Sequence, residues 1–269
     1  MIKSSNIFWG GVLIVLGGLF LVDSLGILDI NLGHIFWPLM LILLGGWVLM
    51  GYFFRDHPVE GEVASIPLEE ARKGALRIHH GAGRLVVGPG AEPMDLAAGI
   101  FGGGLRVRKH WEGDEVDVTL RVRDSGFPMI VFPWFWGAHN NLNWDIQLSD
   151  EIPLDLKLNT GASDTRLDLT DLQIENLRVE TGASLTEIHL PDQVAYTKVV
   201  VKAGAASIKI FVPEGVAARI RTSGGLMGAS IDRDRFPKTG GLHQSPDYDT
   251  AAHRAEIWVN IGAGSLTVS

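Results

Sequence analysis

Side chains that could carry out acid–base or metal chemistry are present in this chain, but their spacing forms no recognised site. The nine histidines are dispersed, and none has another histidine four residues later or a glutamate three residues earlier, as helical metal-binding motifs require. His79 and His80 are adjacent, and adjacent residues on a strand point to opposite faces. Cysteine is absent, which excludes disulfides, thiolate nucleophiles and cysteine-based zinc sites.

Three further patterns resemble functional motifs without matching them. Gly81-Ala82-Gly83 could open a phosphate-binding loop, but a strand pattern follows it where a helix is needed, and the step recurs four more times. Asp164, Asp168 and Asp171 could bind calcium, yet the glycine-rich nonapeptide of calcium-binding β-rolls is absent. The nucleophile motif Gly-x-Ser-x-Gly is absent as well. The sequence therefore predicts a protein that is not an enzyme and that uses no cofactor and no metal.

A glycine-alanine step followed by a small residue recurs five times and is the most informative pattern for the fold. An apolar residue lies three positions before each glycine and another six positions after it, and two consecutive steps are 21 and 22 residues long. A fixed period of this length is typical of a solenoid, whose rungs bury their faces against one another. We expect glycine at each corner because it tolerates positive φ and close stacking. The predicted corners are Gly81, Gly161, Gly182, Gly204 and Gly262.

Within each rung, apolar and polar residues alternate, as half-buried strands do. The predicted fold class is all-β, a single-stranded β-helix-like solenoid of about 21-residue rungs, preceded by a two-helix transmembrane hairpin. Residues 101–104 and 223–230 lie about one period after a corner and are predicted to be irregular rungs. The predicted organisation is a transmembrane hairpin at 1–55, a polar linker at 56–74 and the solenoid at 75–269, with insertions at about 124–143 and 232–253.

The first insertion is unusually rich in aromatic residues. Pro128 and Pro133 oppose a regular strand there, so a loop or broken hairpin is expected. Its side chains are interpreted as a cap on an open solenoid end, with contact to the membrane interface or to a partner protein as the alternatives. The candidate contact residues are Phe127, Phe132, Trp134, Phe135 and Trp136.

Two long apolar stretches at the start of the chain are predicted to cross a membrane. The spans at about 7–28 and 35–54 each reach the roughly 20 residues that a bilayer core of about 30 Å requires. Both begin with Ile-Phe-Trp, and both carry a glycine pair near their middle that would let the two helices approach closely. The residues proposed to pack the hairpin are Gly17, Gly18, Gly45 and Gly46.

The distribution of charge suggests an orientation and restricts the partners. Lys3 precedes the first span and Arg55 follows the second, while the connector contains no lysine or arginine, so both termini are expected in the cytoplasm. The chain would then be a multi-pass cell-membrane protein with a cytoplasmic soluble domain. From residue 56 onward the chain holds 21 Lys and Arg against 29 Asp and Glu, which argues against nucleic acid as a partner.

These parts together resemble a known family combination. The paired spans, with Ile-Phe-Trp and Leu-Gly-Gly in each, resemble the transmembrane region of LiaI/LiaF-like bacterial proteins. The later glycine corners and strands resemble the C-terminal domain of LiaF-like cell-wall-antibiotic response proteins, which is related to toastrack β-domains. The residues that carry this second resemblance are Asn143-Trp144-Asp145, Thr160-Gly161-Ala162-Ser163, Leu167-Asp168-Leu169, Thr181-Gly182-Ala183-Ser184 and Gly262-Ala263-Gly264-Ser265.

The resemblance implies a non-enzymatic, membrane-anchored regulator or sensor module in a bacterial cell-envelope stress response, acting by protein–protein contact. LiaF itself restrains a sensor kinase, so the implied partners are the lipid bilayer and a membrane sensor kinase or another envelope protein. LiaF-like regulators can have more than two spans, which leaves the kinase open. The alternatives are a self-assembling scaffold, which would make the chain a homo-oligomer, and a membrane-surface binding module. The scaffold alternative rests on the strand pattern at the end of the chain, at Val268.

Overall fold

A computed structural model describes residues 61–123 and 142–269, and all of their regular secondary structure is β-strand. None of these residues belongs to a helix with the length and apolarity needed to span a membrane. The predicted transmembrane hairpin, with Gly17, Gly18, Gly45 and Gly46, lies outside the described residues. The strands are β1 (Glu62–Pro67), β2 (Lys73–Pro89), β3 (Asp95–Phe101), β4 (Leu105–Glu112), β5 (Glu115–Val122), β6 (Trp144–Leu148), β7 (Leu154–Asp168), β8 (Ile174–His189), β9 (Tyr196–Phe211), β10 (Val216–Ile231), β11 (Lys238–Thr239), β12 (Leu242–Gln244) and β13 (His253–Val268).

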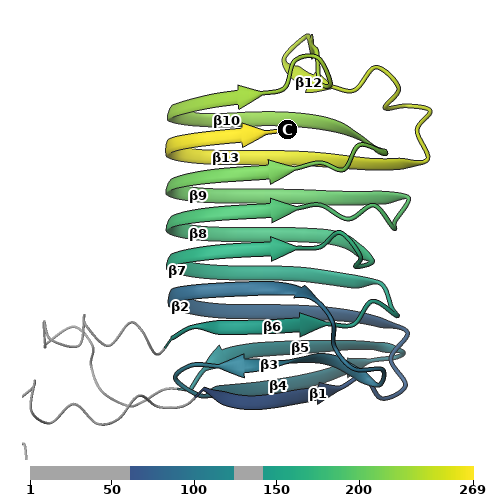
Figure 1. Ribbon diagram of the computed structural model, residues 1–269, viewed down its shortest axis with the longest axis vertical. Helices are drawn as coiled ribbons and strands as arrows, with labels where there is room; N and C mark the ends of the chain where they lie inside the picture. The colour runs from purple at the N-terminus through teal and green to yellow at the C-terminus, as the bar shows by residue number, and fades with distance from the viewer. Residues whose placement is uncertain (1–60, 124–141) are drawn as a thin grey trace, which may run out of the picture. The chain divides into compact units, whose positions relative to one another are not determined.

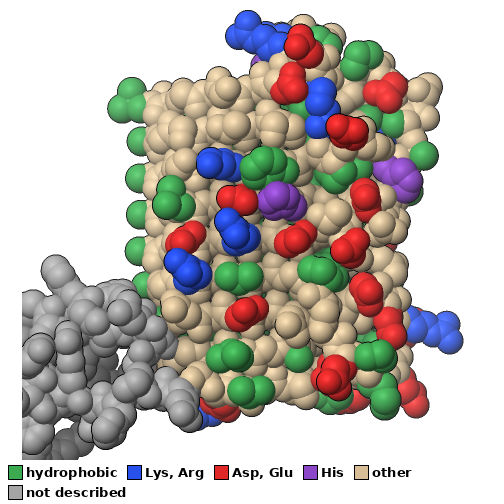
Figure 2. Space-filling model, viewed as in Figure 1, with side chains coloured by type: hydrophobic (Ala, Val, Ile, Leu, Met, Phe, Trp, Pro, Cys, Tyr) green, Lys and Arg blue, Asp and Glu red, His purple; other side chains and the backbone are tan. Residues whose placement is uncertain are grey.

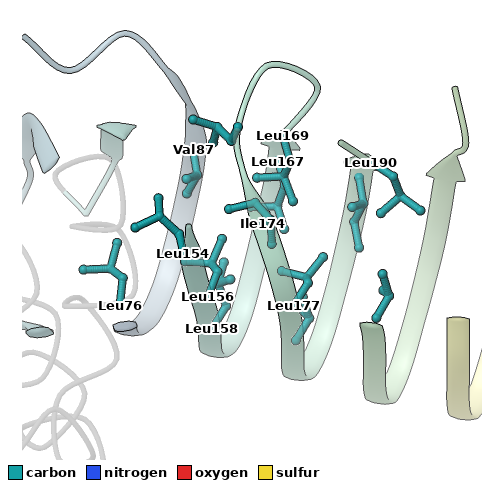
Figure 3. Close-up of a cluster of buried hydrophobic side chains, with 14 of the residues drawn as sticks. Leu76, Val87, Leu154, Leu156, Leu158, Leu167, Leu169, Ile174, Leu177 and Leu190 are labelled. Carbon is teal, nitrogen blue, oxygen red and sulfur yellow. The ribbon is translucent and has the colours of Figure 1, made fainter. Parts of the chain in front are cut away.

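Six long parallel strands form the body of the domain, and each is one rung that bends in the middle (Figure 1). We call the part of a rung before its corner the first leg and the part after it the second leg. The apolar residues three before and six after each predicted corner are all buried, from Ile78 and Val87 in β2 to Val259 and Val268 in β13. The core lies between the two legs, as Figure 3 shows for the leucines of neighbouring rungs. The all-β prediction and the two-residue alternation are therefore confirmed.

The rungs do not make a closed coil. Each long strand bends once, and a loop returns the chain to the next first leg, so the result is one open, folded sheet. These loops also contribute to the core, because Leu169, Leu172 and Leu190 are buried beneath the rungs. The predicted period holds across neighbouring rungs: Ala162 of β7 is in register with Ala183 of β8, which is in register with Ala205 of β9.

The last strand of the chain is not at the end of the stack. The spatial order of the long rungs is β2, β7, β8, β9, β13, β10, so β13 is inserted between β9 and β10 and pairs with both in parallel. Residues 223–230, predicted as an irregular rung, lie in β10, which completes the stack. The strand ending at Val268 is therefore an interior strand with a paired strand on each side. It does not form the uncapped solenoid end that its sequence pattern suggested.

The other end of the sheet departs from the solenoid pattern. The first leg of β2 pairs with β5 and its second leg pairs with β6, so these two short strands together take the place of a rung. Strand β4 pairs with β5, and β3 and β1 continue from β6, with antiparallel neighbours throughout. Residues 101–104 are not an irregular rung as predicted. They end β3 and form a turn to β4 in which Gly103 and Gly104 have positive φ.

The linker prediction also needs correction. Residues 62–67 of the predicted linker form β1, which is paired along its length with β3, and Ile66 is buried. The sequence predicted a linker here because it contains proline and glycine, which are uncommon inside strands. Pro67 occupies the last position of an edge strand, where a missing N–H costs little. The second insertion, 232–253, contains the short strands β11 and β12 and buries Phe236 and Tyr248.

Stacking explains four of the five predicted corner glycines, whereas a Cβ at the fifth, Gly81, would meet no described atom within 4 Å. A Cβ at Gly182 would lie 2.9 Å from the carbonyl oxygen of Gly161, and one at Gly204 would lie 2.7 Å from that of Gly182. Glycines of the next two rungs continue this line: Gly262 above Gly204, and Gly225 of β10 above Gly262. None of the five predicted corner glycines has positive φ, so the part of the prediction that invoked left-handed backbone is wrong. The line requires glycine because consecutive corners approach closer than a side chain allows.

Candidate interaction surfaces

The bend of the sheet forms a narrow apolar ridge, which we call the corner ridge. The alanine after each corner glycine lies in register with the next, and Leu226 takes the same place in β10. The alanines of β7, β8 and β9 are exposed, and Leu226 is 84 % exposed. Figure 2 shows hydrophobic side chains in a column along this edge. The structure thus places the five predicted corners on one exposed line. Its members are Ala82, Ala162, Ala183, Ala205, Ala263 and Leu226.

Both ends of the aromatic insertion are attached beside this ridge. The backbone N–H of Arg123 donates to the carbonyl of Gly104 at 3.1 Å, and the backbone N–H of Arg84 donates to the Asn143 side chain at 3.2 Å. The insertion therefore leaves and re-enters the sheet where a rung made of β5 and β6 would have its corner. The candidate residues Phe127, Phe132, Trp134, Phe135 and Trp136 lie outside the described residues.

A buried histidine holds the re-entry point. The Nε2–H of His80 donates to the carbonyl of Leu142 at 2.6 Å, and its ring packs against Trp144 with centroids 5.4 Å apart. The Trp144 indole N–H donates to the carbonyl of Gly102 at 2.9 Å, and Phe101 packs edge-on against its ring. Burial lowers the pKa of His80, and its Nδ1 has no hydrogen-bond partner. The neutral imidazole is therefore the form that this site accommodates, and its role is structural.

The outer face of the first legs carries paired charges around an open groove of about 430 Å³. Arg77 pairs with Asp117, and Lys73 donates to Glu175 at 2.8 Å while lying 3.4 Å from Asp155. The hydrogen bond to Glu175 raises the pKa of the Lys73 amine. Because four basic and four acidic side chains line it, this groove offers no single-sign field to a charged ligand.

At the β13 end of the same face, aromatic and arginine side chains gather into what we call the aromatic–arginine patch: Tyr196, Arg219, Arg221, Tyr248 and Trp258. The Arg221 guanidinium lies 4.5 Å from the centre of the Trp258 ring, and that of Arg219 lies 4.1 Å from the centre of the Tyr248 ring. Trp258 is 41 % exposed and Tyr196 is 40 % exposed. Tryptophan, tyrosine and arginine are the residues most enriched at the energetic centres of protein interfaces.

Ion pairs and hydrogen bonds fix the geometry of this patch. The Tyr196 hydroxyl donates to Glu256 at 2.8 Å, and Arg221 lies 3.7 Å from the same carboxylate. Burial, and then the hydrogen bond to Glu256, raise the pKa of Tyr196 to about 12, so the phenol stays protonated at physiological pH. The aromatic rings are therefore held in place before any partner arrives, which lowers the entropy lost on binding.

The described sheet contains no cluster of metal-binding side chains. Within residues 61–123 and 142–269, no three histidine, aspartate or glutamate side chains gather closely enough to hold a metal ion. Asp164 and Asp168, considered for calcium, instead face an Arg84 side chain and a threonine: Arg84 lies 3.5 Å from Asp164, and the Thr170 hydroxyl donates to Asp168 at 2.9 Å.

Sequence reasoning missed the aromatic–arginine patch because its members are far apart in the chain. A signal was nevertheless present. Trp258 and Arg221 lie four residues before Gly262 and Gly225, and residues at that position share one row across the sheet. Aligning the rungs on their corners would have placed Val200, Trp258 and Arg221 side by side.

Comparison with known families identifies this architecture. Residues 55–211 match the model of the N-terminal domain of toast_rack, DUF2154, which spans more than half of the chain. The chain belongs to the toast-rack family. Residues 7–49 match the LiaI-LiaF-like transmembrane region, so this toast-rack protein is membrane-associated. The resemblance inferred from the sequence is thereby confirmed. No curated protein matches the chain.

One solved structure supports the same fold. A protein from Clostridium sporogenes ATCC 15579, described as a putative cell adhesion protein, has a TM-score of 0.68 at 16 % identity, covering 78 % of this chain and 98 % of its own. A protein described as a putative adhesin, from Bacteroides fragilis NCTC 9343, covers the same shares at 8 % identity, with a TM-score of only 0.28. The first likeness shows that the toast-rack domain shares its fold with that protein.

Proposed function

We propose that this toast-rack protein is a non-enzymatic, membrane-anchored regulator in a bacterial cell-envelope stress response, and that it acts by protein–protein contact. The observation that carries the proposal is the pairing of a LiaI-LiaF-like transmembrane region with a toast-rack domain in one chain. In this arrangement the membrane segment restricts the domain to the bilayer surface, which raises its effective concentration toward other membrane proteins.

The aromatic–arginine patch is the contact surface that the described geometry supports best. It combines two exposed aromatic rings with two stacked arginines, whereas no aromatic side chain of the described residues lines the neighbouring groove. Binding a protein there would bury the side chains of Trp258 and Tyr196. Each Å² of apolar surface removed from water contributes a favourable transfer free energy of about 25 cal/mol. The partner that fits the family context is a membrane sensor kinase or another envelope protein.

The orientation in the membrane is part of the proposal. Lys3 and Arg55 flank the matched transmembrane region, which supports a two-span hairpin with both termini and the toast-rack domain in the cytoplasm. There the patch would face the cytoplasmic domains of a sensor kinase. The acidic balance of the soluble part gives no support to the alternative of broad adhesion to anionic lipid.

Crosslinking and copurification from native membranes test this proposal. The full-length wild type should copurify with a membrane sensor kinase or another envelope protein, and Trp258→Ser should lose most of that partner. Trp111→Ser is the matched control, because Trp111 is 38 % exposed but lies on β4, away from the patch. Equal recovery of the partner with both variants would reject the patch, and recovery of no membrane partner by the wild type would reject the proposed function.

A further inference from the structure

The two ends of the folded sheet differ in how their edges are protected. At one end, β1 and β4 each pair with a strand on one side only among the described residues. Their edges carry the features that discourage further pairing: Pro67 on β1 and Arg108 and Lys109 on β4. Some edge groups are also satisfied by side chains, since the backbone N–H of Leu105 donates to Glu62 at 3.1 Å.

The opposite end is the second leg of β10, and it has no such protection. The first leg of β10 is covered by β12, which pairs with Arg219 and Ile220. The second leg pairs with β13 on one side, and no described strand pairs with its other side (Figure 1). Residues 222–231, which are this leg and the four residues at the corner before it, contain no charged residue and no proline, and most of them are exposed. An uncharged edge of this length is a template for another strand.

Gly228 provides a second, independent observation. Its φ is not in the left-handed region, and a Cβ at this position would meet no described atom within 4 Å. Neither strain nor crowding within the protomer therefore requires glycine in the middle of this leg. A glycine inside a strand often marks the place where another backbone approaches closely.

We propose that the second leg of β10 pairs, antiparallel, with the same leg of a second copy of this chain, giving a two-fold symmetric dimer with a continuous sheet. The edge is self-complementary in charge, because no register within residues 222–231 places like charges opposite one another. The charged edges at the other end do not match it, so head-to-tail stacking is disfavoured and the assembly closes at two copies. Membrane association concentrates the copies in two dimensions. This inference stands independently of the proposed regulatory function.

The absence of cysteine allows a direct test by single-cysteine crosslinking of the full-length chain in native membranes. Variants carry one cysteine at each position from Leu226 to Ser230 and are treated with a mild oxidant. In a two-fold antiparallel pair one residue faces its own copy, with Cα atoms about 4.5–5.5 Å apart, which a disulfide can bridge. One step along the strand offsets the two copies of a residue by about 7 Å in the strand direction, which puts their Cα atoms beyond the reach of a disulfide, so the disulfide yield should peak sharply at one position. Leu185→Cys is the control, being 63 % exposed in the interior of the stack on β8.

A charge test then checks that the edge itself causes the pairing. Adding Gly228→Lys and Ser230→Lys to the cysteine variant of highest yield, or only the one of them that the cysteine does not occupy, should lower the crosslinked fraction several-fold, because like charges meet across the two-fold axis. The matched control, Ser265→Lys with Thr267→Lys, puts the same charges in the same rows of β13, one strand away from the edge, and should leave the yield unchanged. Equal yields at all positions and at the Leu185 control, no dimeric product at any position, or an equal effect of both lysine pairs would overturn the proposal.

Discussion

At the residue scale, the corner glycines set the spacing of the whole sheet. Because a Cβ at Gly182 would lie 2.9 Å from the Gly161 carbonyl oxygen, Gly182→Val should force neighbouring rungs apart. We expect a loss of about 1–3 kcal/mol in the free energy of unfolding, from overpacking against backbone that has no room to move. Asn159→Val, on the outer face of β7, should be nearly neutral. Urea unfolding of both variants measures the difference, and equal shifts would show that the corners are not closely stacked.

His80 should make the domain sensitive to acid. Burial lowers its pKa in the folded state, so the folded domain disfavours the protonated ring that the unfolded chain accepts readily. The stability that the neutral ring contributes to the folded domain is fully present above the ordinary histidine pKa near 6.5 and is lost as pH falls below it. The urea midpoint should therefore drop more between pH 7.5 and 5.5 for the wild type than for His80→Gln.

His79 provides the control for that measurement. Its pKa is also lowered, by burial and by the nearby Arg121, Lys157 and Arg77, but its side chain is only half-buried. His79→Gln should keep most of the acid sensitivity of the wild type. If removing His79 and removing His80 had the same effect, the acid sensitivity would not come from the imidazole that holds Leu142.

At the element scale, the regular rungs were predictable and the order of the last ones was not. The glycine-alanine step and the flanking apolar residues identify β7, β8 and β9 directly, because each rung repeats the same local requirements. The position of β13 between β9 and β10 depends on where the chain rejoins the sheet after the second insertion. No local sequence pattern predicts that position. β1 was not predicted because a short, half-exposed edge strand buries too few apolar residues to show a clear alternation of apolar and polar residues.

The same distinction applies to the candidate surfaces. Corner positions follow from sequence spacing alone, whereas the aromatic–arginine patch forms only when Tyr196, Arg221 and Trp258 are brought together from three strands. Its hydrogen bond between Tyr196 and Glu256 joins β9 to β13, which are neighbours only because β13 is inserted beside β9. Sequential stacking of the rungs would have placed β10 between these two residues.

The aromatic insertion can be tested as an element. The far end of the parallel stack is already covered by the antiparallel strands β1, β3 and β4, so we expect the insertion to contribute contact rather than a cap. Replacing Trp134, Phe135 and Trp136 by Ser should then leave the melting temperature unchanged and reduce partner copurification or liposome binding. A loss of several kcal/mol with new dye-binding surface would instead support the capping interpretation, because it would mean that large apolar side chains had been removed from a core.

At the scale of the whole molecule, the orientation of the chain decides which partners the domain can meet. We expect both termini in the cytoplasm, because Lys3 and Arg55 flank the predicted spans and the connector has no lysine or arginine. An alkaline-phosphatase fusion after Phe54 should be inactive, and a cytoplasmic reporter fused at the same place should be active. The reverse pattern would put the toast-rack domain outside the cytoplasm.

The most direct test of the central claim is the output of the envelope stress response in cells that lack this chain. We predict that deletion changes the response of a reporter to a cell-wall-active antibiotic, and that the wild-type chain restores it. Trp258→Ser should behave like the deletion while remaining folded and in the membrane, and Trp111→Ser should behave like the wild type. An unchanged response on deletion, or full restoration by Trp258→Ser, would contradict a regulator that acts through contact at the aromatic–arginine patch.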